Sequence, residues 1–362
     1  MWQFFLRLTD SIMRSPCFWI WPLVSAAMLA LPAQAATVQP SQTQSTIDAL
    51  ARANASVVGV RVTVAEGARS AETLGQRRSG SGVLIASDGL ILTIGYLLLE
   101  AEQIEIVTQD NKTLPARVVA YDLATGFGLL RPLLPLRASS NVSVAVLGSS
   151  QFAQPGEALM AVTGPQPNDD GDVNMTRLIS KRAFSGNWEY HIETALFTSP
   201  PIVANQGNHS GAPLFNQKGE LIGIGSLLVS DATGQNRRMP GNMFVPVDLL
   251  RPILAELQQS GSSVKSRRPW LGLNSNDQGG RVQITRVSKD SPAEGAGLEA
   301  GDVVLAVDGA KVSTLEDFYK KLWNRAAPDA EISLTVLQGA DVKTIVLKAQ
   351  DRMQTLKKPA GI

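Results

Sequence analysis

The sequence predicts a mainly β protein in which β-barrels or sandwiches are followed by a small α+β domain. Between residues 57 and 247, short β-branched runs alternate with clusters of Gly, Pro, Asn and Asp, and hardly any helical pattern interrupts them. Short strands at such spacing are typical of all-β domains. Beyond residue 269 the pattern changes to strands mixed with helices. With 362 residues, 44% of them hydrophobic, the chain can bury a core in each of two or three domains.

The first 35 residues have the composition of a secretory signal peptide. Arg7 and Arg14 precede an apolar run over residues 17–31, and Ala33-Gln34-Ala35 offers small residues for cleavage. The alternative is an uncleaved membrane anchor, but the run is shorter than the roughly 20 residues that span a bilayer, and a proline interrupts it. We therefore expect the signal to be cleaved and the protein to be exported to a bacterial periplasm.

Charge, cysteine and histidine content exclude several kinds of site. Removal of Arg7, Arg14 and Asp10 with the signal lowers Lys plus Arg from 33 to 31 and Asp plus Glu from 32 to 31, so the mature chain is neutral. A neutral chain without a basic stripe gives no reason to expect nucleic acid or an anionic membrane as partner. The only cysteine lies in the signal, and the chain has two histidines. We therefore expect no disulfide, no metal site and no cofactor.

The elements of the first folded part follow from periodicity and turn signals. Polar residues 37–46 predict a solvated linker, and residues 47–53 a short helix, so that residues 36–56 form an N-terminal linker and helix. Strands are expected at 57–62, 82–85, 90–93, 104–108, 116–120, 128–130, 158–162, 221–224 and 243–245. Apolar residues at helical spacing predict a closing helix over residues 247–259. We assign residues 57–259 to one barrel-containing domain.

The second part begins after a serine-rich and then basic stretch, residues 260–268, which predicts a flexible linker. A strand at 281–287 leads to a short helix that Ser291 can cap and a glycine can end. A strand at 303–307, a helix at 314–325 and strands at 331–337 and 342–347 follow. We therefore expect a compact α+β domain at 269–351 and a C-terminal tail at 352–362.

Three groups of motifs follow one another along the chain. The first is Gly80-Ser81-Gly82-Val83-Leu84, which leads through residues 85–92 to Thr93, and the second is Ser210-Gly211-Ala212-Pro213-Leu214. The third lies beyond residue 269 and consists of Trp270-Leu271-Gly272-Leu273, Ser291-Pro292-Ala293 and Gly301-Asp302. In this order they resemble the HtrA (DegP/DegS) family of trypsin-like proteases, which has a Gly-Ser-Gly-Val-Ile strand pair leading to Thr-Asn-x-His-Val, then Gly-Asn-Ser-Gly-Gly-Pro-Leu, and then a PDZ domain. The resemblance covers residues 47–351 and implies a trypsin-like double six-stranded β-barrel followed by a PDZ domain.

The proteolytic activity that the family implies needs a serine made nucleophilic by a histidine, with an aspartate orienting the imidazole. By resemblance, Ser210 takes the position of the nucleophile, Tyr96 that of the histidine and Gly126 that of the aspartate. A phenol with a pKa of about 10 is protonated at neutral pH and is a poor base. Asp122 lies nearby in the sequence but has no imidazole to orient. We therefore expect both activating partners of Ser210 to be missing.

The loop around Ser210 also departs from the family pattern. A register set by Ser-Gly-x-Pro-Leu places Asn208 at the oxyanion glycine and His209 at the asparagine, whereas a register set by Gly207-Asn208 places His209 at the nucleophile. In the first register, the amides of Asn208 and Ser210 can still form an oxyanion hole. His209 adjoins the serine and points away from it, and His191 belongs to the second barrel. We expect surface or packing roles for both histidines.

The PDZ-like part keeps what peptide binding needs. PDZ domains bind the C-terminal carboxylate of a peptide on backbone N–H groups and add the peptide as a strand to a sheet edge. By resemblance, the carboxylate loop consists of Trp270, Leu271, Gly272 and Leu273. The peptide would lie between the following strand and the helix at 314–325, whose candidate lining residues are Leu315, Phe318, Tyr319 and Leu322. The alternative is that these four side chains only build the core.

Together these features predict a periplasmic HtrA-like pseudoprotease of protein quality control, which binds peptides or protein C-termini as a scaffold or regulator. Related active proteases are candidate partners. One alternative is a serine endopeptidase with non-standard activation of Ser210, for example by a group from another subunit. A third interpretation is an assembly platform. The family implies a homo-trimer built through the segment before the first barrel, and here that segment is short and lacks aromatic residues.

Overall fold

The computed structural model describes residues 42–136, 142–167, 169–202, 209–324 and 327–356. The predicted signal peptide, most of the polar segment after it, and the end of the predicted tail lie outside these ranges. Helix α1 (Gln42–Asn54) is longer than the predicted helix at 47–53. Within the described ranges, no helix has both the length and the hydrophobicity needed to cross a membrane.

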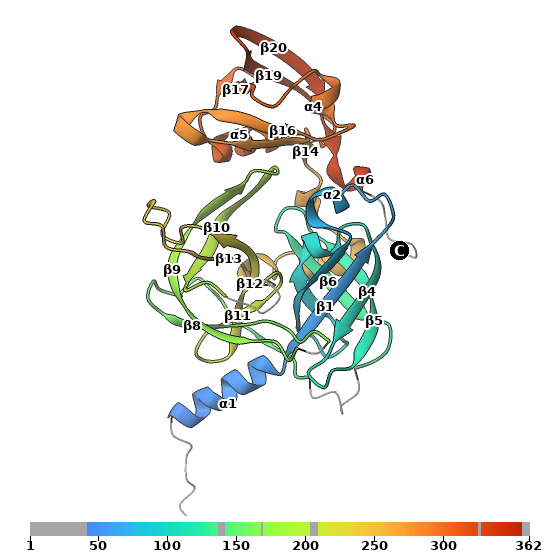
Figure 1. The fold of residues 1–362 in the computed structure, drawn as a ribbon, viewed down its shortest axis with the longest axis vertical. Helices are drawn as coiled ribbons and strands as arrows, with labels where there is room; N and C mark the ends of the chain where they lie inside the picture. The colour runs from blue at the N-terminus through green and yellow to red at the C-terminus, as the bar shows by residue number, and fades with distance from the viewer. Residues whose placement is uncertain (1–41, 137–141, 168, 203–208, 325–326, 357–362) are drawn as a thin grey trace, which may run out of the picture. The chain divides into compact units, whose positions relative to one another are not determined.

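The first barrel closes through six antiparallel strands in the order β1-β2-β3-β6-β5-β4 (Figure 1). In the C-terminal half of β1, exposed and buried side chains alternate: Arg61 and Thr63 are exposed between buried valines. This is the pattern of a strand with one face packed on a core. Short helices α2 (Ala71–Leu74) and η1 (Gly95–Leu98) lie between strands. The strands are β1 (Val57–Val64), β2 (Arg77–Leu84), β3 (Ile91–Ile94), β4 (Ala101–Val107), β5 (Thr113–Tyr121) and β6 (Phe127–Pro132).

The second barrel is a sheet in the order β11-β8-β9-β10-β13-β12, which closes because β11 also pairs with β12. A short strand, β7, pairs in parallel with the first residues of β12. The strands are β7 (Val146–Leu147), β8 (Ala158–Val162), β9 (Val173–Gly186), β10 (Tyr190–Ser199), β11 (Pro213–Phe215), β12 (Glu220–Val229) and β13 (Gly241–Pro246). The predicted double six-stranded barrel is therefore confirmed.

The C-terminal part has its own sheet and its own hydrophobic core. The sheet runs β15-β16-β17-β19-β20, and helix α5 (Leu315–Trp323) begins at Thr314, whose hydroxyl accepts a hydrogen bond from Asp317 N. Its elements are β14 (Pro269–Trp270), β15 (Leu273–Asn276), η5 (Gln278–Gly280), β16 (Val282–Val287), α4 (Pro292–Gly295), β17 (Val303–Val307), β18 (Ala310–Lys311), β19 (Glu331–Gln338), β20 (Asp341–Lys348), β21 (Gln350–Asp351) and α6 (Arg352–Thr355).

One predicted element was wrong and one long hairpin was not predicted. The predicted helix at 247–259 is a 3-10 turn η3 (Val247–Leu249) followed by a short helix α3 (Leu254–Ser260). Pro252 interrupts it, because proline has no N–H to donate and disfavours helical geometry at the residue before it. The long hairpin of β9 and β10 was not among the predicted strands. Much of β9 is half-buried and carries Lys and Arg side chains, so it lacks a clear apolar alternation.

The stretch after α3, predicted to be a flexible linker, contains two buried serines. Ser263 and Ser266 are 2% and 0% exposed, and their hydroxyl groups donate hydrogen bonds to the carboxylate of Asp122. Ser263 N, Thr125 N and the Thr125 hydroxyl donate to the same carboxylate. Burial disfavours the charge of Asp122, but these hydrogen bonds outweigh it and lower the pKa of the carboxyl. Asp122 therefore fastens this stretch to the first barrel.

We predict that Asp122→Asn lowers the free energy of unfolding at pH 7 by about 2–3 kcal/mol, because the amide cannot accept all these hydrogen bonds. The folded pKa of Asp122 lies below the unfolded one, so its stabilisation is present above about pH 4 and is lost as the pH falls through the folded pKa. Urea unfolding at pH 7 and pH 3 measures both effects. Asp88→Asn, which removes an exposed ion pair with Arg131, is the control and should cost less than about 1 kcal/mol. Equal losses in the two variants at pH 7 would contradict this role.

Candidate functional site

The backbone of the Ser210 loop is fixed between the two barrels. Ser210 O accepts a hydrogen bond of 2.8 Å from Ser81 N of β2, and Gly211 N donates to Gly225 O of β12 at 2.8 Å. Gly211 has a φ of 77°, and a Cβ there would lie 2.1 Å from Ser81 O. Only glycine fits such a close approach in this backbone conformation. The loop thus holds Ser210 where strands of both barrels meet.

Tyr96, in the η1 turn that follows β3, places its hydroxyl 2.6 Å from Ser210 Oγ. The same hydroxyl lies 2.7 Å from the carbonyl oxygen of Ser226. A carbonyl can only accept, and a neutral phenol has one proton to give. The phenol proton therefore points to Ser226 O, and the hydroxyl of Ser210 donates to the oxygen of Tyr96.

Among the described residues, the side chain paired with the Ser210 hydroxyl is a phenol, which is a poor base. Burial raises the pKa of Tyr96 to about 12, although the hydrogen bond with Ser210 lowers it in part. At neutral pH the phenolate then amounts to about one molecule in 10⁵. A neutral phenol oxygen accepts the hydrogen bond of Ser210 but does not take its proton. The contact with Tyr96 satisfies the serine hydroxyl rather than activating it.

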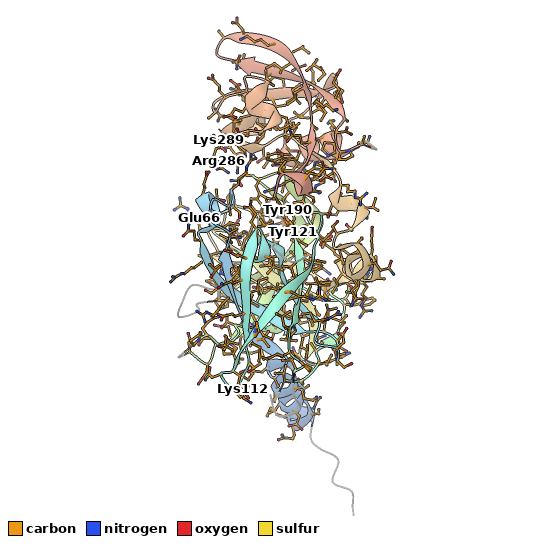
Figure 2. All side chains as sticks on the ribbon, turned by 90° about the vertical axis from the view of Figure 1, so that its right-hand side faces the viewer. Glu66, Lys112, Tyr121, Tyr190, Arg286 and Lys289 are labelled. Atoms are coloured by element: carbon orange, nitrogen blue, oxygen red, sulfur yellow. The ribbon has the colours of Figure 1, made fainter. Side chains whose placement is uncertain are left out.

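Gly126 lies in the turn before β6 with a φ of 82°. Its N–H donates to Asp122 O, and its carbonyl accepts from Gly95 N, which precedes Tyr96. A Cβ at Gly126 would lie 3.3 Å from the hydroxyl oxygen of Tyr190, which donates to Thr125 O. Tyr190, labelled in Figure 2, belongs to β10 of the second barrel. It occupies the space beside Gly126, where the resemblance places an orienting carboxylate.

The two histidines contact groups other than Ser210. The imidazole of His209 interacts with the backbone of Ser226, and burial lowers its pKa. His191 Nδ1 lies 2.9 Å from Ser185 Oγ, and its Nε2 lies 3.5 Å from Glu193. Among the hydrogen bonds of the described residues, neither imidazole is paired with Ser210. It is the side chain of Ser210, not that of His209, that meets Tyr96.

His191, Glu193 and Glu316 are the one group in the described part of the chain whose potential metal-ligating atoms lie within 4.8 Å of one another. Lys320 Nζ already contacts both carboxylates, Glu193 at 3.0 Å and Glu316 at 2.6 Å. The ammonium group neutralises one of the two negative charges that would attract a cation, and it occupies the space between the carboxylates. Asn208, the other predicted member of the oxyanion loop, lies outside the described residues.

The predicted carboxylate loop of the C-terminal domain binds a carboxylate from the same chain, that of Glu189. Glu189 Oε1 accepts from Gly272 N at 2.8 Å and from Leu273 N at 2.7 Å. Glu189 Oε2 accepts from Leu271 N at 3.1 Å. Glu189 is 3% exposed, and burial raises the pKa of its carboxyl despite these hydrogen bonds. The N–H groups of the loop therefore offset only part of the cost of burying the charge.

Of the four α5 residues predicted to line the peptide groove, all lie in the hydrophobic core and one also forms a hydrogen bond with the β9–β10 hairpin. Leu315, Phe318 and Leu322 are buried in the hydrophobic core of the domain. Tyr319 is also buried, but its hydroxyl donates to Gly186 O, at the end of β9, at 2.7 Å. Trp270 is half-buried and pairs with Gln350 of β21.

Sequence reasoning missed Glu189, the residue that fills the loop. The Gly186-Asn187 pair just before it is a turn signal that could have revealed the hairpin. Nothing local in the sequence indicates what the glutamate side chain binds, because its partners lie more than 80 residues further along the chain.

Two parts of the chain match known protein families. Residues 80–224 match the trypsin-like peptidase domain, and residues 269–349 match the PDZ domain. A probable periplasmic serine endoprotease DegP-like of Halomonas elongata is 28% identical over 299 residues, which cover 79% of this chain and 59% of the relative. The serine endoprotease DegS of Haemophilus influenzae is 27% identical over 269 residues, which cover 72% of this chain and 73% of the relative. The chain belongs to the HtrA family.

Solved structures of HtrA proteins share the fold. The HtrA-type protease AlgW with tripeptide superposes with a TM-score of 0.51 at 21% identity, covering 88% of this chain and 98% of that one. The serine endoprotease from Yersinia pestis gives a TM-score of 0.51 at 23% identity, covering 86% and 98%. The predicted order of a trypsin-like double barrel and a PDZ domain is confirmed. This HtrA chain spans 59% of the length of its Halomonas elongata relative.

We predict that Gly126→Ala lowers the free energy of unfolding by at least about 1 kcal/mol more than Gly156→Ala. Both glycines have positive φ, 82° and 92°, so both substitutions introduce backbone strain. A Cβ at Gly126 meets Tyr190, whereas a Cβ at Gly156 has nothing within 4 Å. Chemical denaturation of the two variants isolates the effect of Tyr190. If both variants lose the same free energy of unfolding, Tyr190 does not exclude a side chain at position 126.

Proposed function

We propose that this HtrA protein is a periplasmic pseudoprotease that binds peptides or protein C-termini through its PDZ domain. The observation that carries the proposal is the Tyr96 hydroxyl, 2.6 Å from Ser210 Oγ, at the position where the family has its histidine. A phenol with a pKa of about 12 cannot supply the general base that a serine nucleophile requires.

The position of the orienting carboxylate supports the same conclusion. Gly126 has no side chain, and Tyr190 lies beside it. Asp122, the nearest carboxylate along the chain, is buried and committed to Ser263, Ser266 and Thr125. Serine proteases stripped of their triad keep only about 10³-fold to 10⁴-fold catalysis over water, from the oxyanion hole and substrate binding. Residual catalysis of this size does not degrade proteins at a useful rate.

The proposed location and partners follow from the leader and the family. The first 35 residues have the pattern of an export signal, and DegP-like relatives carry the word periplasmic in their names. PDZ domains recognise extended peptides by strand addition and by capture of a C-terminal carboxylate. Solved structures of the HtrA-type protease AlgW contain a decapeptide and a tripeptide. We propose a scaffold or regulator, with related active proteases and a second and third copy of this chain as candidate partners.

An assay of casein degradation tests the loss of proteolysis. We expect purified protein to degrade casein about a million-fold more slowly than trypsin, the loss expected when the triad of a serine protease is removed. The rate should equal that of the Ser210→Ala variant, because an unactivated serine contributes nothing to it. Degradation by the wild-type protein that Ser210→Ala abolishes would overturn the proposal and favour a serine endopeptidase with non-standard activation.

A further inference from the structure

The tip of the β9–β10 hairpin has a backbone conformation that does not favour the residue found there. Asn187, Trp188 and Glu189 form a three-residue turn between the paired residues Gly186 and Tyr190. Glu189 has a φ of 58°, in the left-handed region where this kind of turn usually has glycine. The geometry of the turn therefore does not explain the glutamate. Its side chain does, since the carboxylate is almost completely buried on backbone N–H groups of the PDZ domain.

The hairpin tip contacts the PDZ domain in the two ways in which a peptide ligand would. Its carboxylate, that of Glu189, accepts hydrogen bonds from the N–H groups of Leu271, Gly272 and Leu273. Its backbone meets the sheet edge, because Ser275 N of β15 donates to Asn187 O at 2.9 Å. Carboxylate capture and strand pairing are the two components of PDZ recognition.

Helix α5, on the other side of the predicted groove, also contacts the hairpin. The Tyr319 hydroxyl donates to Gly186 O at 2.7 Å and accepts from Glu189 N at 3.3 Å. Further along the hairpin, Lys320 Nζ lies 3.0 Å from Glu193. The tip thus contacts the carboxylate loop, β15 and α5, which are the three elements that a bound peptide needs.

We propose that the β9–β10 hairpin is a built-in ligand of the PDZ domain, so that a peptide with a free C-terminal carboxylate binds only by displacing Glu189. This inference rests on the proposed peptide-binding function. A ligand tethered in the same chain has an effective concentration of about millimolar, which a peptide at micromolar concentration must overcome. The apparent affinity for such a peptide falls in proportion to the fraction of molecules whose loop is free.

The experiment measures binding of a decapeptide pool, with randomised C-terminal residues and free carboxylates, to the full chain. The same pool with amidated C-termini shows whether binding needs the carboxylate. Glu189→Gly removes the carboxylate and suits the left-handed turn, so it should fold. Glu189→Gln keeps the size of the side chain but cannot offer two acceptor oxygens. Glu193→Gln is the matched control, because Glu193 lies on the same hairpin but is exposed and contacts Lys320 instead of the loop.

We expect the Glu189→Gly variant to bind the free-carboxylate pool with an apparent Kd at least about tenfold lower than that of the wild-type protein. Glu189→Gln should show a smaller gain, Glu193→Gln should stay within about twofold of wild type, and the amidated pool should not be retained. Equal affinities of the wild type and both Glu189 variants for the free-carboxylate pool would overturn the inference while the peptide-binding function stands. Absence of binding by every variant would overturn the peptide-binding function itself, and the inference with it.

Discussion

The single proton of the Tyr96 phenol decides what Ser210 can do. Because Ser226 O can only accept, that proton is directed to the carbonyl, and the hydroxyl of Ser210 must donate to the phenol oxygen. The rest of the site is compatible with this one arrangement. Gly211 keeps the loop close to Ser81, and Gly126 leaves room for Tyr190 instead of carrying a carboxylate. In our account, a serine in the backbone setting of a protease is thus held in a hydrogen-bond network that does not activate it.

In the PDZ domain, too, a group from the same chain occupies a predicted functional site, here the carboxylate of Glu189. The backbone N–H groups of the domain's predicted carboxylate loop bind Glu189 of the second barrel in this structure. Burial raises the pKa of that carboxyl, which means that the docked hairpin carries a desolvation cost. In our account the barrel of this HtrA protein serves as a ligand for its own recognition domain.

The sequence could predict the parts of this account that depend on local patterns and on motifs in order. Short β-branched strands predict the barrels, and the resemblance brings Tyr96 to Ser210, where the structure has the two hydroxyl groups in contact. It could not predict that Tyr190 fills the space beside Gly126, because that tyrosine comes from the other barrel. Nor could it predict Glu189, since β9 has little apolar alternation and the partners of the carboxylate are remote in the sequence. The buried serines after α3 looked like a flexible linker because their partner, Asp122, is 141 residues away from Ser263.

The most direct measurement of the central claim is the reaction of Ser210 with a fluorophosphonate probe, which labels serines made nucleophilic by a base. Labelling is read at the Ser210 peptide by mass spectrometry on the folded protein, with Ser210→Ala as background. We predict no labelling above that background, because the Ser210 hydroxyl donates its hydrogen bond to a neutral phenol, which does not take up the proton. Stoichiometric labelling of Ser210 would contradict the account and show that the serine is activated in spite of Tyr96.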